Sequence, residues 1–290
     1  MLTALTFLAD LPIYETVKPY QIKGFPDVDD AVRTNVVRIK KDGISVENVR
    51  KSTRETEFEE CGFRWLKHES KYAIKSDDFE ARSDDNPFVL GYLQETMDLI
   101  RAELGAKAVF CFDWRIRRNV DSIIDQFEDQ DVAYSRHYVA PPVSIVHMDF
   151  SKQGGHDRIR AHFTENEYRE IEQNHARILM INVWRPFQVV RDVPLALCDR
   201  RSVQTNDALE IDEVLPTHVE MEAFVKYRKH HEWYWLADQK PDEPAMFITW
   251  DSTSDRVDGG GVPHAACMDV LAEAGQQARE SIEVRTMVML

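Results

Sequence analysis

The chain has 290 residues and a mass of 33.7 kDa, which is long enough for one large domain with a sizeable core. Its composition, 43% hydrophobic and 30% charged, is that of a globular protein and argues against disordered and collagen-like classes. The formal net charge of −15, without any long run of Lys or Arg, argues against a nucleic-acid partner.

The cysteines and the N-terminal segment indicate the cellular compartment. Four cysteines lie far apart and form no C-x-x-C pair, so neither a disulfide framework nor a thiolate zinc site is predicted. The N-terminal segment lacks a basic region, and Asp10 interrupts an apolar run that is too short to span a bilayer. We therefore expect a cytoplasmic protein with a small-molecule partner and no membrane partner, and we leave its oligomeric state open.

In chain order, the first predicted element is an edge strand at 35–40, inside an N-terminal covering region at 1–107. Apolar residues at helical spacing predict an amphipathic helix over 86–104, which Gly105 stops. A strand at 108–113, a short helix at 120–128 and a further helix at 165–175 follow. Further strands, separated by Gly, Pro, Asp or Asn clusters, are predicted at 178–183, 194–197, 245–250 and 281–290.

This succession of elements predicts the fold. Short strands with helices gathered before and between them are typical of a mainly β double-stranded β-helix, the cupin-like jelly roll, with helices packed outside it. We expect a single domain over residues 1–290, in which residues 108–290 form the jelly-roll core. The mouth of the barrel is then the expected pocket.

The clearest chemical signal is a candidate metal site. His147 and Asp149 end an apolar, strand-like segment, and because they are two positions apart they share one face of the strand. His264 follows a Gly-rich loop and precedes the final predicted strand. Two imidazoles and one carboxylate are the ligand set of non-haem iron(II) oxygenases, which keep the opposite face of the ion open. These three residues are therefore the predicted metal ligands.

A second pattern downstream of His264 predicts a co-substrate. Arg279 and Ser281 are two positions apart and share one face of the last strand. A planar guanidinium beside a hydroxyl suits the distal carboxylate of 2-oxoglutarate. Arg285, on the same alternating face, is the fallback anchor. The alternative is that Arg279 only pairs with a neighbouring glutamate at the surface.

Several runs of residues together resemble a known family. They are VHMDF at 146–150, INVWRPF at 181–187, PLALCDRRSV at 194–203, WYWLADQKPDE at 233–243, PHAA at 263–266 and RESIEVR at 279–285. In this order they resemble fungal and bacterial secondary-metabolism hydroxylases and desaturases, including gibberellin desaturase-like and cephamycin methoxylation-associated proteins. The resemblance, over about residues 108–290, implies a double-stranded β-helix that oxidises a small organic substrate. It also places His147, Asp149 and His264 on the metal and Arg279 with Ser281 on the oxo acid.

Further side chains are assigned to the cofactor and the substrate. Asn182 and Trp184 share one face of the NVWRP strand, where Asn182 is expected to hydrogen-bond 2-oxoglutarate. Trp184 is expected either beside the substrate or in the core. Arg117 is expected to face a substrate carboxylate or to form a local ion pair. Phe150, in a stretch that borders the substrate in the family, and Trp235, in an aromatic cluster, complete the predicted substrate residues.

The expected reaction is the hydroxylation, desaturation or cyclisation of a small natural product, with release of succinate and CO2. Iron(II), 2-oxoglutarate and O2 are the expected cofactors. The carboxylate of Asp149 argues against a halogenase, in which a small residue replaces this ligand. Two alternatives remain. One is a zinc-dependent hydrolase that uses the same two histidines and aspartate, although the sequence lacks an H-E-x-x-H motif. The other is a non-catalytic jelly-roll binding module.

Overall fold

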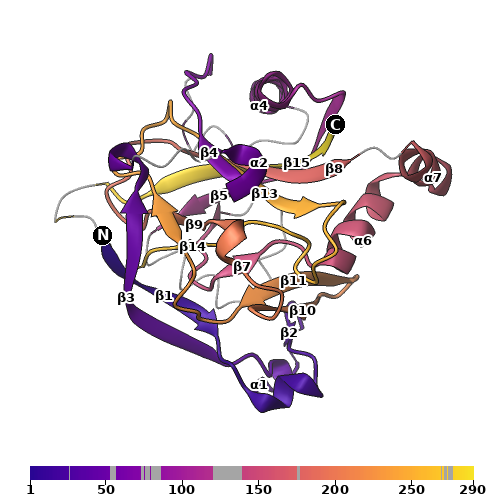
Figure 1. The fold of residues 1–290 in the computed structure, drawn as a ribbon. Coiled ribbons are helices and arrows are strands. Elements are labelled where there is room, and N and C mark those ends of the chain that lie inside the picture. The colour runs from indigo at the N-terminus through magenta and orange to yellow at the C-terminus, as the bar shows by residue number, and fades with distance from the viewer. Residues whose placement is uncertain are drawn as a thin grey trace.

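Two β-sheets face one another across the core of the protein in the computed structural model (Figure 1). The structure describes residues 1–25, 27–52, 57–72, 75, 79, 86–119, 139–174, 177–268, 270, 273 and 277–290. The helix predicted over 120–128 lies outside these residues. Apolar side chains from the inner faces of the two sheets form much of the core, as a jelly roll requires.

One sheet contains six strands within the described ranges. In spatial order they are β4 (Phe63–Trp65), β13 (Ala245–Asp251), β8 (Ile178–Pro186), β15 (Glu280–Met289), β5 (Ala108–Arg118) and β6 (Val139–Ala140). Every residue of the central strand β8 is buried, because both of its faces are covered. Its odd-numbered residues Ile181 and Val183 belong to the apolar cluster that also contains Ile100 of helix α4 (Pro87–Leu104). Its even-numbered residues therefore face the other sheet.

The facing sheet contains nine strands, again counting only the described parts of the chain. In spatial order they are β1 (Leu2–Leu8), β3 (Arg38–Asn48), β12 (Trp233–Trp235), β9 (Leu195–Cys198), β14 (His264–Ala266), β7 (His147–Met148), β11 (Val219–Val225), β10 (Ala208–Val214) and β2 (Tyr20–Ile22). Strands β1, β2 and β4 lie at sheet edges, so the N-terminal region supplies edge strands to both sheets, as the sequence predicts. The predominance of β-strands and their arrangement in two facing sheets confirm the predicted jelly roll.

The helices lie outside the two sheets (Figure 1). They are α1 (Asp30–Arg33), α2 (Phe58–Cys61), α4, α6 (Lys152–His162) and α7 (Glu165–Gln173), with short 3-10 helices η1 (Pro12–Glu15), η2 (Val49–Lys51) and η3 (Arg200–Ser202). The predicted helix 86–104 is confirmed as α4. The Asn86 side chain accepts a hydrogen bond from the Phe88 amide, and Gly105 ends the helix with a φ of 62°.

Helix α6 is an element that the sequence does not predict. It begins at the Ser151 cap, whose hydroxyl accepts a hydrogen bond from the Gly154 amide at 3.0 Å. Gly154 and Gly155 lower the intrinsic helix propensity of its first turns, which conceals the helix in the sequence. Both glycines are needed for packing. A Cβ atom at Gly154 would lie 2.0 Å from the Met221 carbonyl oxygen, and a Cβ atom at Gly155 would lie 2.2 Å from the Trp250 ring.

Replacing Gly154 therefore tests how closely α6 packs on β11. In an exposed helix, Gly→Ala stabilises the fold by about 0.5–1 kcal/mol. Here the methyl group meets backbone, so we expect Gly154→Ala to lower the free energy of unfolding by about 1–3 kcal/mol in urea titrations. Gln153→Ala, at an exposed position of the same turn, is the control and should leave stability close to wild type. A stabilised Gly154→Ala protein would contradict the close contact.

Strand boundaries differ from the prediction where charged residues continue a strand. Strand β5 extends beyond 113 to Arg118, because Arg115 and Arg117 alternate with the buried Trp114 and Ile116. Strand β3 begins at Arg38 rather than at residue 35 and is longer than predicted. The inward charges on β5 are paired inside the barrel, as the contact between Arg115 and Asp113 at 3.0 Å illustrates.

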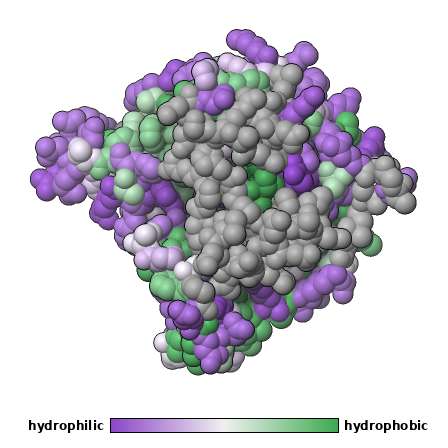
Figure 2. Space-filling view, turned by 180° about the vertical axis from the view of Figure 1, so that it is seen from behind, coloured by the Kyte–Doolittle hydropathy of each residue, from purple (hydrophilic) through white to green (hydrophobic). Residues whose placement is uncertain are grey.

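The surface carries many polar side chains. Figure 2 shows hydrophilic residues over much of the described surface on the back of the molecule, with smaller hydrophobic patches between them. This distribution agrees with the 30% of charged residues in the sequence. Among the described helices, none combines the length and apolar character that crossing a bilayer requires.

Candidate metal centre and cofactor pocket

His147, Asp149 and His264 lie together between the two sheets. His147 and His264 are directly opposite each other on the paired strands β7 and β14, with ring centroids 4.3 Å apart. Oδ1 of Asp149 lies 3.4 Å from Nε2 of His147 and 3.6 Å from Nε2 of His264. All three residues are buried, and one ligand atom from each lies within 4.8 Å of the others. A single cation between them would contact two nitrogens and one carboxylate oxygen.

The second ring nitrogen of each histidine fixes its tautomer. Nδ1 of His147 is 2.9 Å from the Ile145 carbonyl oxygen, and Nδ1 of His264 is 3.0 Å from the Val262 carbonyl oxygen. Because a carbonyl only accepts, each Nδ1 carries a hydrogen, and in the neutral ring Nε2 then has its lone pair toward Asp149. Histidines that bind metals show this arrangement.

The charges around the triad favour a cation. Burial opposes ionisation of Asp149, but Arg285 and the two imidazoles hold its pKa well below the ordinary value. Burial, together with the nearby His147, lowers the pKa of His264 to about 4, so this ring is neutral near pH 7. Burial also lowers the pKa of His147, but the Asp149 carboxylate outweighs burial and raises it overall. The site thus stabilises one positive charge beside a carboxylate, as a metal centre does.

Asn182 and Arg285 hold the Asp149 carboxylate from the opposite sheet. They are paired across β8 and β15. Nδ2 of Asn182 donates to Oδ2 of Asp149 at 2.7 Å, whereas Nη2 of Arg285 lies 3.9 Å from Oδ1. Asn182 therefore contacts Asp149, one of the predicted metal ligands, where the sequence predicts a contact with 2-oxoglutarate. Its Oδ1 is buried and has no hydrogen-bond partner within the described part of the chain.

Arg279 and Ser281 present unused donors inside the barrel. They are 2% and 0% exposed, and Nη1 of Arg279 donates to the Val193 carbonyl oxygen at 2.5 Å. Nε of Arg279 and Oγ of Ser281 are buried without a hydrogen-bond partner among the described residues. Leaving such groups unpaired costs about 1–3 kcal/mol each, so they fit a missing polar ligand. The alternative of a surface ion pair for Arg279 is wrong, because this side chain is buried.

The charge of Arg279 suits an anionic ligand. Burial and the nearby Arg117 lower its pKa to about 10, so the guanidinium remains protonated at neutral pH. Its central carbon lies 5.5 Å from the centroid of the Trp184 ring, which restricts its position. A carboxylate is the group that accepts from a guanidinium and a hydroxyl together.

One narrow cavity connects the two histidines of the predicted metal site to Arg279. Its walls include His147, His264, Trp184, Arg279 and Arg117. Its volume, about 20 Å³, accommodates roughly one water molecule, so a five-carbon diacid enters only when the lining side chains move apart. The residues fit iron and 2-oxoglutarate in the chemistry of their donors and in their order along the cavity.

Comparisons with known proteins place the chain in a family. Its sequence matches a family described as "Oxidoreductase/YMDC permease-like domain" over residues 5–289. The chain belongs to this family. Among similar proteins, the alpha-ketoglutarate-dependent dioxygenase tstK of Talaromyces stipitatus is 25% identical and covers 96% of each chain. The alpha-ketoglutarate-dependent dioxygenase phiK of a fungal species is 26% identical, over 95% of this chain and 94% of its own.

A further relative and a solved structure extend the family comparison. The gibberellin cluster GA4 desaturase of Gibberella fujikuroi is 31% identical over 38% of this chain and 34% of its own. The iron and alpha-ketoglutarate-dependent endoperoxidase NvfI has the same fold, with a TM-score of 0.79 at 20% identity over 100% of this chain and 97% of its own. The predicted family, enzyme class and cofactors agree with these relatives, and the predicted jelly-roll fold is confirmed.

Not every predicted substrate residue reaches the cavity of this family member. Trp184 and Arg117 line it. Phe150 lies just beyond the end of β7 and outside the lining of this cavity, and it packs with Met180 of β8 and Ile159 of α6 in a separate apolar cluster. Trp235 packs against the apolar cluster on the outer face of the nine-stranded sheet, because its neighbour Tyr234 takes the inward position of β12.

Glu283 and Arg285 lie beside the predicted metal site, where the sequence pattern does not predict them. Nε of Arg285 donates to Oε1 of Glu283 at 2.9 Å, and Glu283 lines the cavity. Arg285 is predicted above as a second possible anchor for 2-oxoglutarate. In the structure its guanidinium lies beside the Asp149 carboxylate instead. The alternation of Arg279, Ser281, Glu283 and Arg285 on one strand is the signal that could have located all four on the inner face.

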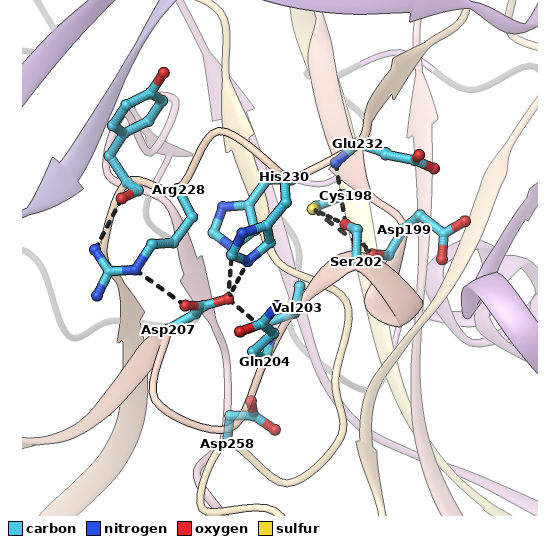
Figure 3. Close-up of polar contacts among 12 residues, drawn as sticks. Cys198, Asp199, Ser202, Val203, Gln204, Asp207, Arg228, His230, Glu232 and Asp258 are labelled. Carbon is cyan, nitrogen blue, oxygen red and sulfur yellow. Dashed lines mark hydrogen bonds and ion pairs between the residues drawn. The ribbon is translucent and has the colours of Figure 1, made fainter.

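A second group of histidines and a carboxylate lies outside this cavity, around Asp207 (Figure 3). Nε2 of His230 lies 2.7 Å and Nε2 of His231 3.2 Å from Oδ2 of Asp207, while Nε of Arg228 donates to Oδ1 at 3.1 Å. The Gln204 amide also donates to Oδ2, at 2.8 Å. Both oxygens of Asp207 are therefore already engaged by donors.

The Asp207 group differs from the metal triad in its outer hydrogen bonds. Nδ1 of His231 is buried and has no hydrogen-bond partner in the described residues, unlike the Nδ1 atoms of His147 and His264. A ligating histidine normally donates this hydrogen to an acceptor. We therefore interpret the group as a structural network that joins the start of β10 to the segment before β12.

This interpretation predicts the result of removing the carboxylate. Asp207→Ala leaves Arg228 and two histidines without their shared acceptor, so we expect it to lower the free energy of unfolding by about 3 kcal/mol. Because the group holds no metal, the number of Co(II) ions bound per chain should remain that of the wild type. Urea unfolding and equilibrium dialysis measure the two quantities. Loss of one bound ion without a change in stability would contradict the structural role.

Proposed function

We propose that the protein is an iron(II)- and 2-oxoglutarate-dependent oxygenase that hydroxylates, desaturates or cyclises a small natural product. The observation that carries this proposal is a cavity lined by both histidines of the buried triad and by Arg279, whose Nε is buried without a hydrogen-bond partner among the described residues. Two histidines and one carboxylate are the ligands of iron enzymes that activate dioxygen beside an oxo acid. The relatives named as alpha-ketoglutarate-dependent dioxygenases support the same reaction class.

Each residue has a defined role in this proposal. His147, Asp149 and His264 hold iron(II), which when bound supplies the oxidising chemistry. Arg279 and Ser281 hold the distal carboxylate of 2-oxoglutarate through charge-assisted hydrogen bonds. Trp184 packs beside Arg279 and limits the access of water to this end of the cavity. The protein thus contributes binding, orientation and charge.

The chemistry of the surroundings supports a small-molecule substrate. The relatives include proteins named hydroxylase/desaturase, among them efuI of Hormonema carpetanum. The net charge of −15 opposes nucleic acid as a partner. Cys61 and Cys198 are buried and form no disulfide, which supports a reducing compartment, the cytoplasm. We place the reaction there.

Two experiments test this function. Anaerobic titration of the protein with Fe(II) and then 2-oxoglutarate should produce a weak visible charge-transfer band. Oxygen-dependent release of succinate, measured across a panel of natural products, should identify substrates. Absence of the band together with substrate hydrolysis under anaerobic conditions would instead establish the zinc-hydrolase alternative. Absence of any stoichiometric metal binding would favour a non-catalytic jelly roll.

A further inference from the structure

The two oxygens of Asp149 have different surroundings. Oδ1 faces Nε2 of both histidines, at 3.4 and 3.6 Å. Oδ2 accepts a hydrogen bond from Nδ2 of Asn182 at 2.7 Å. Because an ionised carboxylate only accepts hydrogen bonds, the amide group must present its NH2 side to Asp149. One oxygen is therefore directed at the metal position and the other is engaged on the opposite side.

Asn182 is itself held firmly in place. It lies in the central strand β8, paired with Phe247 of β13 on one side and with Arg285 of β15 on the other, and it is 0% exposed. Arg285 is too far from Oδ1, at 3.9 Å, for a hydrogen bond, and its Nε is engaged by Glu283. Arg285 thus supplies charge, whereas Asn182 supplies the directed bond that sets the rotation of the carboxylate.

The free end of the amide argues against a purely structural role for Asn182. Oδ1 of Asn182 is buried and has no hydrogen-bond partner among the described residues. Buried amides that serve only the fold normally have both ends satisfied. Here only the end that touches a metal ligand is used, so the residue is retained in the core for its effect on Asp149.

The number of oxygens that Asp149 offers decides how many coordination positions remain. An octahedral ion has six positions. Two histidines and one oxygen of Asp149 would take three of them, and 2-oxoglutarate bound through two oxygens would take two more. One position would then remain for dioxygen. If the carboxylate rotated to give both oxygens to the metal, that last position would be filled.

We propose that Asn182 is a positioning residue that holds Oδ2 of Asp149 away from the metal and so keeps one coordination position open to dioxygen. This inference rests on the proposed function. It makes Asn182 dispensable for the occupancy of the site by metal and 2-oxoglutarate at saturating concentrations but important for the binding of a diatomic ligand. A side chain that only supported the fold would affect all three, or none.

The test uses Asn182→Leu, which is similar in size but has no donor, and Thr286→Val as the control. Thr286 is equally buried and donates to the Ile181 carbonyl oxygen, beside Asn182, at 2.9 Å. The probes are Fe(II), 2-oxoglutarate and nitric oxide, which binds ferrous iron where dioxygen does and gives an electron paramagnetic resonance signal. Asn182→Ala is the second variant, for the case that the leucine unfolds the barrel.

We expect the Asn182 variants to bind one Fe(II) per chain at saturating Fe(II) and, once loaded, to form the 2-oxoglutarate charge-transfer band. Their affinity for nitric oxide should fall by at least about tenfold, and oxygen-dependent succinate formation without a primary substrate should fall with it. Thr286→Val should match the wild type in every measurement. X-ray absorption of the Fe(II) form should show an additional oxygen ligand in the variants.

Three results would overturn the inference. Wild-type affinity for nitric oxide in both Asn182 variants would show that the amide does not control the open position. Loss of Fe(II) binding in the variants would show that Asn182 is needed to place the Asp149 carboxylate at the metal, and not to keep one of its two oxygens away from the metal. Absence of the charge-transfer band in the wild-type protein would reject the proposed function itself, and this inference with it.

Discussion

Asp149→Ala should abolish stoichiometric binding of Fe(II) and of Co(II), and with it the oxygen-dependent formation of succinate. The substitution removes the carboxylate that lies within 3.4–3.6 Å of both imidazoles and leaves two neutral nitrogen ligands. Changes to outer hydrogen-bond partners of a metal cost about 10–100-fold in affinity, and loss of a ligand should exceed that range. Equilibrium dialysis with Co(II) measures the affinity directly.

Asp207→Ala is the matched control for this experiment. It also removes a buried carboxylate that contacts two histidines, yet it should keep the bound metal and lose stability instead. Thermal unfolding adds a second measurement. Co(II) at about 100 times its Kd should raise the free energy of unfolding of the wild type by about 2.7 kcal/mol and should leave that of Asp149→Ala unchanged. Retention of full affinity in Asp149→Ala would reject the triad as the metal site.

Arg279→Ala should raise the KM for 2-oxoglutarate about 10–100-fold while leaving the affinity for Co(II) unchanged. The guanidinium provides a charge-assisted hydrogen bond to the carboxylate, which contributes about 1.5–3 kcal/mol to binding. The fold around the pocket should stay intact, because the Asn119 amide donates to the backbone carbonyl of Arg279, which the substitution keeps, and the side chain gives up only its hydrogen bond to the Val193 carbonyl and its contact with the Trp184 ring.

The control for Arg279 is Arg185→Ala. Arg185 is also buried and also donates to carbonyl groups, those of His68 and Pro241, but it lies on the outer face of β8. This variant should lose stability and keep the wild-type KM for 2-oxoglutarate. An unchanged KM in Arg279→Ala would mean that the oxo acid binds elsewhere, and equal effects in both variants would point to general damage to the barrel.

Local patterns in the sequence account for the elements that were predicted correctly. The helix α4 is continuous, has an Asn cap and ends at a glycine, so all its signals lie within one short segment. His147 and Asp149 share a face because alternation along a strand is local. In contrast, the two adjacent glycines of α6 are chosen for contact with β11 and Trp250, and this contact is not visible in the sequence.

The partners of the site residues depend on strand register, which the sequence does not contain. The pairing of His264 with His147 arises because β7 and β14 are neighbours, and only the order of motifs in a resembling family suggested it. Asn182 was placed on the correct face, but its partner is Asp149 on the other sheet. Trp235 belongs to a run of three aromatic residues, so no alternation indicates which of them points inward.

The inner face of β15 limits which insertions the enzyme can tolerate in this strand. The proposed oxo-acid anchor lies where this strand begins, at Arg279 immediately before it and Ser281 within it, and the cation beside the proposed iron ligand lies further along, at Arg285. The distance between co-substrate and metal is therefore set by backbone spacing, about 3.4 Å per residue. Insertion of a single residue within β15 would turn one of the two groups outward and separate them in one step. Variation in substrate range should accordingly arise on other strands and loops.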